Sequence, residues 1–138
     1  MSVEHENGVR AYSVFVHEKV HQVDFFNILK KQGKPQQDLI RAHFKKRIEY
    51  LQQHGAKATQ HHEWFKSLAH SSMGFIEIRL NSVKLLQVRA LYLEVDGVYY
   101  VLKAFSKLDS TYGGGKGMAR AQQEAMSRFY ALQEEAKQ

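Results

Sequence analysis

Residues 85–105, with the sequence LLQVRALYLEVDGVYYVLKAF, decide the fold of this chain. Both halves are rich in β-branched and aromatic residues, and Asp96-Gly97 joins them. This dipeptide predicts a β-hairpin, because a type I′ turn needs positive φ at both central residues. A two-residue turn also sets the pairing along the two strands. It places Val95 opposite Val98, Leu91 opposite Leu102, Arg89 opposite Ala104 and Ala90 opposite Lys103.

Upstream of the hairpin, the apolar pattern changes from a strand to two helices and back. Residues 11–16 alternate with a period of two, which predicts a strand. Residues 18–31 carry apolar side chains at helical spacing. A second helix is predicted from an apolar stripe that ends before Gly55, and residues 75–80 alternate again as a strand. The stripe consists of Ile40, Phe44, Ile48 and Leu51.

Downstream of the hairpin, a glycine-rich loop at 106–117 leads into a last amphipathic helix that ends near Leu132. The predicted order of elements is therefore β-α-α-β-β-β-α, which indicates an α+β fold. A length of 138 residues fits one domain over 1–138, with loose ends expected at 1–10 and 133–138.

The charge of the chain favours a polyanionic partner. Lysine and arginine total 20 against 14 acids, a formal charge of +6, which suits a nucleic acid or an acidic protein segment. The alternative is a basic surface that only keeps the protein soluble. We expect the basic run on the second predicted helix to be such a solvated face. This run consists of Arg41, Lys45, Lys46 and Arg47.

Compartment and cofactors follow from what the sequence lacks. It has no cysteine, which excludes disulfides, thiolate metal sites and a cysteine nucleophile. Residues 1–10 are polar and do not resemble a signal peptide, and no stretch approaches the ~20 apolar residues of a membrane-spanning helix. We therefore expect a cytoplasmic protein without a membrane partner, a metal or a small-molecule cofactor.

One motif points to different chemistry. Residues 17–21, His17-Glu18-Lys19-Val20-His21, have the H-E-x-x-H spacing that places two zinc ligands and a general base on one helix face. However, His17 directly follows a predicted strand, Lys19 would put a cation beside the metal, and no third ligand has a characteristic spacing. A small zinc hydrolase is therefore a less favoured hypothesis. His61, His62, Glu63 and His70 are possible further ligands, equally well explained as exposed loop residues.

The glycine run at 113–117, GGGKG, does not match a phosphate-binding P-loop. That motif needs serine or threonine directly after its lysine, and Gly117 stands there instead. We interpret the run as a flexible loop beside the functional surface.

Several cations fall on the predicted strands, where a charge is costly unless it faces a cleft, an acid or a phosphate. Aromatic rings beside such cations suit single-stranded RNA, whose bases stack on them. The alternative is that Glu77 and Glu94 pair with Arg79 and Arg89 structurally. The cations are Arg79, Arg89, Lys103 and Lys107, with Tyr99, Tyr100 and Tyr112 nearby in the sequence.

Five short motifs follow one another along the chain: WFKSL at 64–68, GFIEIR at 74–79, VRALY at 88–92, VLKAFSK at 101–107, and the set Ala125, Arg128 and Phe129. In this order they resemble the phage-derived HigB-type branch of the RelE/ParE toxin superfamily, over about residues 11–132. The resemblance implies a small twisted, mostly antiparallel sheet flanked by helices. It also implies a type II toxin that cleaves mRNA on the ribosome without a metal and that a cognate antitoxin holds inactive.

The resemblance assigns roles to individual residues. Arg89 and Lys107 would hold the scissile phosphate, Arg79 matches the basic residue of the E-x-R strand, and Tyr112 would stack on or orient a base. Cations of this kind stabilise the negative charge that develops when the 2′-hydroxyl attacks the adjacent phosphate. Further RNA contacts are expected from Lys66, Lys103 and Arg128.

Two alternatives use the same scaffold, since a fold does not fix a function. One is a gyrase-targeting toxin. The other is a non-catalytic interaction protein, which would be favoured if Arg89 and Lys107 were buried against carboxylates.

Overall fold

A computed structural model describes residues 2–4, 10–68 and 73–137 of the chain. The elements confirm the predicted α+β class and add two short strands, β1 and β3, that the sequence pattern did not predict. In order they are β1 (Ser2–Glu4), β2 (Arg10–Val16), the π-helix η1 (Val20–Phe25), α1 (Phe26–Leu29), α2 (Lys34–His54), the 3-10 helix η2 (Gly55–Gln60), β3 (Phe65–Ser67), β4 (Ile76–Arg79), the 3-10 helix η3 (Val83–Leu85), β5 (Val88–Val95), β6 (Val98–Ser106) and α3 (Gly115–Ala136).

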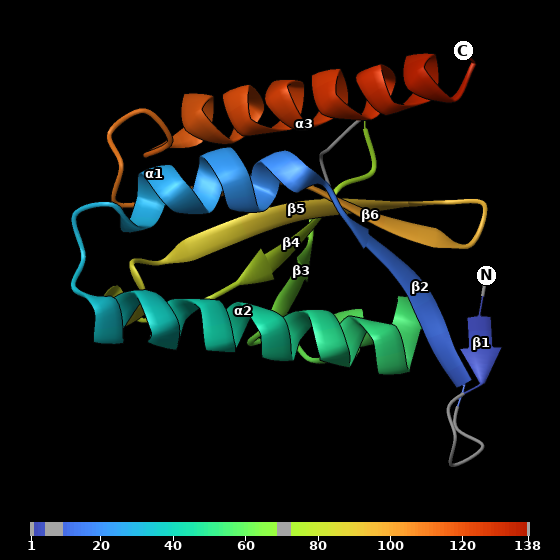
Figure 1. Cartoon of the computed structure of the whole chain (residues 1–138), viewed down its shortest axis with the longest axis horizontal. Coiled ribbons are helices and arrows are strands. Elements are labelled where there is room, and N and C mark those ends of the chain that lie inside the picture. Colours follow the sequence, from blue (N-terminus) through green and yellow to red (C-terminus); the bar gives the residue numbers. More distant parts are fainter. Residues whose placement is uncertain (1, 5–9, 69–72, 138) are drawn as a thin grey trace.

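The described strands form one mixed sheet in the order β1-β2-β6-β5-β4-β3. Only β2 and β6 pair in parallel, so the sheet is mostly antiparallel, as predicted. In Figure 1, α3 lies on one side of the strands and α2 on the other. The helical segment η1–α1 packs beside β6. No described helix has both the length and the apolar character needed to cross a membrane.

The sheet separates two apolar cores, because successive strand side chains point to opposite faces. The core between the sheet and α2 also takes in the residues of η1 and α1 that face inward. Its largest buried side chains include Phe25, Leu29, Ile40, Leu51, Phe65 and Tyr92. The core between the sheet and α3 is built from Phe75, Leu91, Leu93, Leu102, Phe105, Ala121, Ala125 and Phe129.

The predicted hairpin turn is confirmed. Asp96 and Gly97 have φ values of 51° and 82°, and Val95 lies opposite Val98. The register predicted further along is wrong, because a β-bulge interrupts the ladder between Leu91 and Tyr92. Tyr92 still faces Val101, but Leu91 faces Lys103, Ala90 faces Ala104 and Arg89 faces Phe105.

The bulge decides which way Lys103 points. In the uninterrupted register Lys103 would face Ala90, in the apolar core under α2. The extra residue, Leu102, moves Lys103 opposite Leu91, which belongs to the core under α3. Paired residues of an antiparallel ladder share a face, so Leu102 and Lys103 both point toward α3.

The helical segments start and stop largely as expected. The segment predicted at 18–31 is helical, although its first turns form the π-helix η1. α2 has a proline in its first turn and ends at Gly55, which has a φ of 54°. A Cβ atom at Gly55 would lie 2.8 Å from the ring of Tyr12, so both the backbone and the space require glycine.

The described chain ends are more regular than predicted. Residues 2–4 pair with β2, and α3 continues through Ala136. The sequence predicts loose ends at 1–10 and 133–138, of which residues 1, 5–9 and 138 lie outside the described part of the chain. The glycine run is also shorter as a loop than expected, because α3 begins at Gly115.

Candidate functional site

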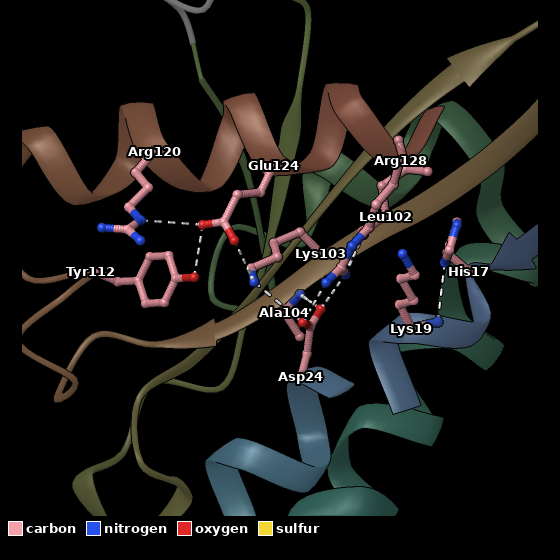
Figure 2. Close-up of polar contacts among 10 residues, drawn as sticks. All are labelled: His17, Lys19, Asp24, Leu102, Lys103, Ala104, Tyr112, Arg120, Glu124 and Arg128. Carbon is pink, nitrogen blue, oxygen red and sulfur yellow. Dashed lines mark hydrogen bonds and ion pairs between the residues drawn. The ribbon is translucent and has the colours of Figure 1, made fainter. Parts of the chain in front are cut away.

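A buried carboxylate near the end of η1 joins this helix to β6 and α3 (Figure 2). Asp24 is 3% exposed. Its Oδ1 accepts hydrogen bonds from Lys103 Nζ at 3.2 Å and Arg128 Nη2 at 2.8 Å. Its Oδ2 accepts from the backbone N–H of Ala104 at 2.8 Å and from Arg128 Nη1 at 2.6 Å. Four donors therefore converge on one carboxylate.

Side chains, in place of a neighbouring strand, bind the backbone of β6 beyond Val101. β2 pairs with β6 only from Val98 to Val101. Beyond that point the Ala104 N–H donates to Asp24, and Arg128 Nη1 donates to the carbonyl oxygen of Leu102 at 2.9 Å. Unpaired backbone groups along a buried strand edge are costly, so Asp24 and Arg128 complete the hydrogen bonding of the sheet.

Lys103 extends the network to a second carboxylate. Its Nζ lies 3.2 Å from both Asp24 Oδ1 and Glu124 Oε2. The hydroxyl of Tyr112 donates to Glu124 Oε1 at 2.8 Å, and Lys103 Nζ lies 5.2 Å from the centre of the Tyr112 ring. We call these five residues, Asp24, Lys103, Tyr112, Glu124 and Arg128, the Asp24 cluster. Its two carboxylates balance its two buried cations, and the exposed Arg120 on α3 lies 3.6 Å from Glu124 Oε1 at the edge of the cluster.

The pKa shifts in the Asp24 cluster keep its ion pairs charged at neutral pH. Burial works to lower the pKa of Lys103, but the attraction of Asp24 and the contacts with Tyr112 and Glu124 raise it overall. Burial works to raise the pKa of Glu124, but its bonds to Tyr112 and Lys103 lower it overall. Burial is also the main reason that the pKa of Tyr112 is raised. None of these shifts moves a group toward general-base behaviour at neutral pH.

A second buried carboxylate, Glu77, lies on β4 and is 3% exposed. Its Oε1 is 3.3 Å from Arg79 Nε and 3.4 Å from Arg89 Nε. Both Nε atoms are buried, yet neither makes a hydrogen bond. Two guanidinium groups thus share one carboxylate, and one positive charge is left without a partner in this set. We call Glu77, Arg79 and Arg89 the Glu77 cluster.

The Glu77 cluster lies on the same side of the sheet as α3. Glu77 is opposite Leu91, which belongs to that core, and Arg79 is opposite Arg89. Arg89 is 3% exposed, and its Nη1 donates to the carbonyl oxygens of Leu80 and Val88. Burial lowers the pKa of Arg89, and Glu77 partly restores it.

Two lysines of the predicted site, one catalytic and one RNA-binding, remain at the surface. Lys66 on β3 is exposed and is paired with Glu77 in the ladder, so it shares that face of the sheet. Lys107 is exposed directly after β6, where its N–H donates to the carbonyl oxygen of Gln87. Neither lysine forms an ion pair with a described residue. Because β4 and β5 separate β3 from β6, the backbones of the strands that position these lysines lie about 14 Å apart.

The structure thus divides the predicted site residues into two groups. Arg79 and Arg89 contact Glu77, Lys66 is the ladder partner of Glu77 on β3, and Lys107 is exposed directly after β6. Lys103, Tyr112 and Arg128 instead belong to the Asp24 cluster, where their polar groups bind carboxylates of the protein. The alternative in which Glu77 and Glu94 pair structurally with Arg79 and Arg89 is confirmed for Glu77, which contacts both arginines. It is wrong for Glu94, because Glu94 Oε1 accepts a hydrogen bond from the N–H of Gly97 in the hairpin turn.

Sequence reasoning missed Asp24, Glu124 and the role of Arg47. Asp24 is the one acid within the apolar helical segment 20–29, and that position is the signal that could have revealed it. Arg47 was expected on a solvated face, but it is buried against the Trp64 ring, 4.1 Å from its centre. Its Nε donates to the carbonyl oxygen of Arg79, and burial lowers its pKa to about 10.

The geometry disagrees with zinc binding by the H-E-x-x-H string. His17 is 6% exposed and its Nδ1 accepts the N–H of Lys19 (Figure 2). The His21 ring instead stacks on Phe25. The two imidazoles line separate pockets, one beside α3 and one beside α2. His17 precedes the helix, and the i→i+5 bonds of η1 rotate the chain away from α-helical spacing. The described residues contain no group of three or more possible metal ligands, and His70 lies outside them.

No protein family model matches the chain, and neither does any curated protein or solved structure. The function must therefore be argued from the chemistry of the two clusters. The Asp24 cluster is balanced and internally bonded, which fits a structural role. The Glu77 cluster has an excess of positive charge beside exposed lysines, which makes it the candidate functional site.

Proposed function

We propose that this protein is a type II toxin similar to the phage-derived HigB-type branch of the RelE/ParE superfamily, and that it cleaves mRNA on the ribosome without a metal. One observation carries the proposal: Arg79 and Arg89 share the single carboxylate of Glu77, and the side chain of Arg79 is still 27% exposed. A phosphate group that contacts the exposed part of the Arg79 side chain would balance the extra positive charge. The α+β element order and the mostly antiparallel sheet agree with the resemblance.

The burial of each cation refines the proposed roles. The side chain of Arg79 is 27% exposed and Lys107 is exposed, so these two can reach the scissile phosphate. They would stabilise the charge that develops as the 2′-hydroxyl attacks phosphorus and the bond to the 5′-oxygen breaks. Arg89 is a positioning residue, because it is buried and holds Glu77 in place. Lys66 would bind the neighbouring backbone.

The partners follow from this surface. In the cytoplasm the substrate would be mRNA held by the ribosome. A cognate antitoxin would inhibit the toxin by covering the same cations with an acidic segment.

A second candidate is a non-catalytic interaction protein. The burial of Arg89 against Glu77 favours it, because this is the arrangement expected for cations that hold the fold together. Lys107 does not fit this reading, since it is exposed. A gyrase-targeting toxin on the same scaffold would also use an exposed basic surface.

The proposal is tested by induced expression in a bacterial host, with growth recorded and new mRNA 5′ ends mapped. We expect growth arrest with 5′ ends inside translated messages, and loss of both in Arg79→Ala/Lys107→Ala. The matched control is Lys45→Ala/Lys46→Ala on α2, across the sheet, which removes the same charge and should stay toxic. Circular dichroism of each purified variant checks its fold.

The three readings give different results in this experiment. Arrest with intact mRNA would exclude the nuclease and point to another target such as gyrase. Normal growth with intact mRNA would leave the non-catalytic interaction protein. Equal loss of toxicity in the control variant would show that net charge matters and that Arg79 and Lys107 are not a specific site.

A further inference from the structure

A groove of about 600 Å³ runs between the end of α1 and the segment that follows β6. Asn27, Lys30 and Lys31 line it from the α1 side, and Leu108, Thr111 and Tyr112 line it from the other. Its lining also includes Asp24 and Lys103, so the groove borders the Asp24 cluster.

The lysines of this groove are available to a ligand, while its acids are already bonded. Lys30 and Lys31 are exposed, and neither forms an ion pair with a described residue. By contrast, the nearby Lys34 binds Asp38 at 2.6 Å. In the groove, Asp24 binds two cations, and Asp109 Oδ1 accepts the N–H of Thr111. The groove therefore presents positive charge to a ligand.

An aromatic ring stands beside these lysines. Phe26 is 61% exposed and lies four residues before Lys30 in the same helical segment, so the two side chains occupy one face. Cations next to an exposed ring suit single-stranded nucleic acid, because the backbone binds the charge and a base stacks on the ring. An acidic peptide would use the lysines but would gain less from the ring.

We propose that this groove binds single-stranded RNA, with Lys30 and Lys31 contacting phosphates and Phe26 stacking on a base. This inference rests on the proposed function, since it gives the path of the strand next to the cleavage site. It concerns a different surface, because none of these three residues belongs to the Glu77 cluster.

The test measures binding of a fluorescein-labelled 12-nucleotide polyuridine RNA to the full-length protein by fluorescence anisotropy, from 50 to 200 mM salt. In Lys30→Ala/Lys31→Ala we expect affinity to fall about 10-fold or more at 0.1 M salt. The slope of log affinity against log salt should fall by about 1.4, at about 0.7 per phosphate contact on a single strand. Lys45→Ala/Lys46→Ala removes equal charge from α2 and should retain most of the affinity and slope.

A second pair of variants tests the contribution of the Phe26 ring to RNA binding. Phe26→Ala should weaken binding about 5-fold or more without changing the salt slope. Tyr130→Ala, which removes an exposed ring from α3, should leave binding unchanged. Thermal unfolding of each variant confirms that these surface changes leave the protein folded.

Three results would overturn the groove assignment. One is equal losses in the Lys30/Lys31 and Lys45/Lys46 variants, which would indicate diffuse charge. Another is binding of polyglutamate in preference to polyuridine, which would indicate a protein partner. The third is no binding of RNA by the wild type. The toxin proposal is decided separately, by growth and mRNA 5′ ends, so a failure of the groove assignment can be distinguished from a failure of the proposed function.

Discussion

Two buried clusters of carboxylates and basic side chains in this protein differ in how well their charges are matched. The Asp24 cluster and the Glu77 cluster each hold a carboxylate that is 3% exposed between two cations. Asp24 accepts four hydrogen bonds of 3.2 Å or less, and Glu124 supplies a second negative charge. Among the described residues, no second carboxylate pairs with the two arginines beside Glu77, and its contacts with the two Nε atoms lack hydrogen-bond geometry.

The difference shows how a buried charge cluster can be interpreted. Charges removed from water are stable only when paired and hydrogen-bonded, so a balanced cluster contributes to the fold. A cluster with more cations than carboxylates can still bind an anion from outside the protein. By this criterion the Asp24 cluster holds η1, β6 and α3 together, and the Glu77 cluster is the one that we propose as the anion-binding site.

The largest expected effect comes from removing the centre of the balanced cluster. Asp24→Ala leaves Lys103 and Arg128 without this partner and the Ala104 N–H unsatisfied. We expect the free energy of unfolding in urea to fall by about 3–5 kcal/mol. Asp38→Ala removes an exposed acid that binds Lys34 and should cost about 0.5 kcal/mol or less. Similar losses in both variants would contradict the structural role of Asp24.

The next effect separates stability from binding. Glu77→Gln keeps the shape of the side chain but leaves both arginines without a carboxylate. We expect the free energy of unfolding to fall by about 2 kcal/mol, less than for Asp24→Ala because Arg79 reaches solvent. Affinity for polyuridine should rise, since the surface becomes more positive. Weaker RNA binding by a folded Glu77→Gln protein would remove this cluster from the proposed site.

A smaller effect is expected at the edge of the Asp24 cluster. Tyr112→Phe removes the hydrogen bond to Glu124 but keeps the ring packed 5.1 Å from Phe105. We expect a loss of about 1 kcal/mol in urea unfolding, and almost none for the exposed Tyr130→Phe. If toxicity is abolished in a Tyr112→Phe protein of normal stability, the hydroxyl has a functional role beyond this bond.

The smallest expected effect is a dependence of stability on pH. Burial lowers the pKa of His17 below its ordinary 6.5, and Arg128 lowers it further. The unfolded chain then binds more protons than the folded chain just below pH 6.5, so stability is lost as pH falls through this value. His21 and His43 act in the same direction, mainly through burial. The free energy of unfolding in urea, measured from pH 7.5 to 5.5, should show this decline. His17→Asn should make the decline smaller. If the free energy of unfolding of His17→Asn falls with pH as steeply as that of the wild type, the assignment to His17 is wrong.

Local signals were read correctly where a few neighbouring residues decide the structure. The Asp96-Gly97 turn and the end of α2 before Gly55 depend on positive φ values that few residues adopt. These residue types therefore predict both features directly. β3 was missed because a three-residue strand carries too little periodicity to be recognised. The bulge at Leu102 was missed because Leu102 and Lys103 fit either face of an alternating pattern.

The sequence predicted which residue types form the candidate site, but it did not predict which carboxylate each cation binds. Arg79 and Arg89 were predicted as cations on strands, and both lie against Glu77. Lys103, predicted on a strand, and Arg128, taken from the resemblance, instead bind Asp24, which is 79 and 104 residues away in the sequence. No local pattern specifies such a pairing.

The sequence by itself determined the α+β class, the hairpin, the order of the helices and the positive charge of the chain. These features depend on periodicity, turn geometry and composition, which are properties of short segments. Only the tertiary structure decided which cations are neutralised and which remain available. That outcome depends on the bulge that turns Lys103 toward α3 and on the end of β2 at Val16, because the open edge of β6 then takes Asp24 and Arg128 as its partners.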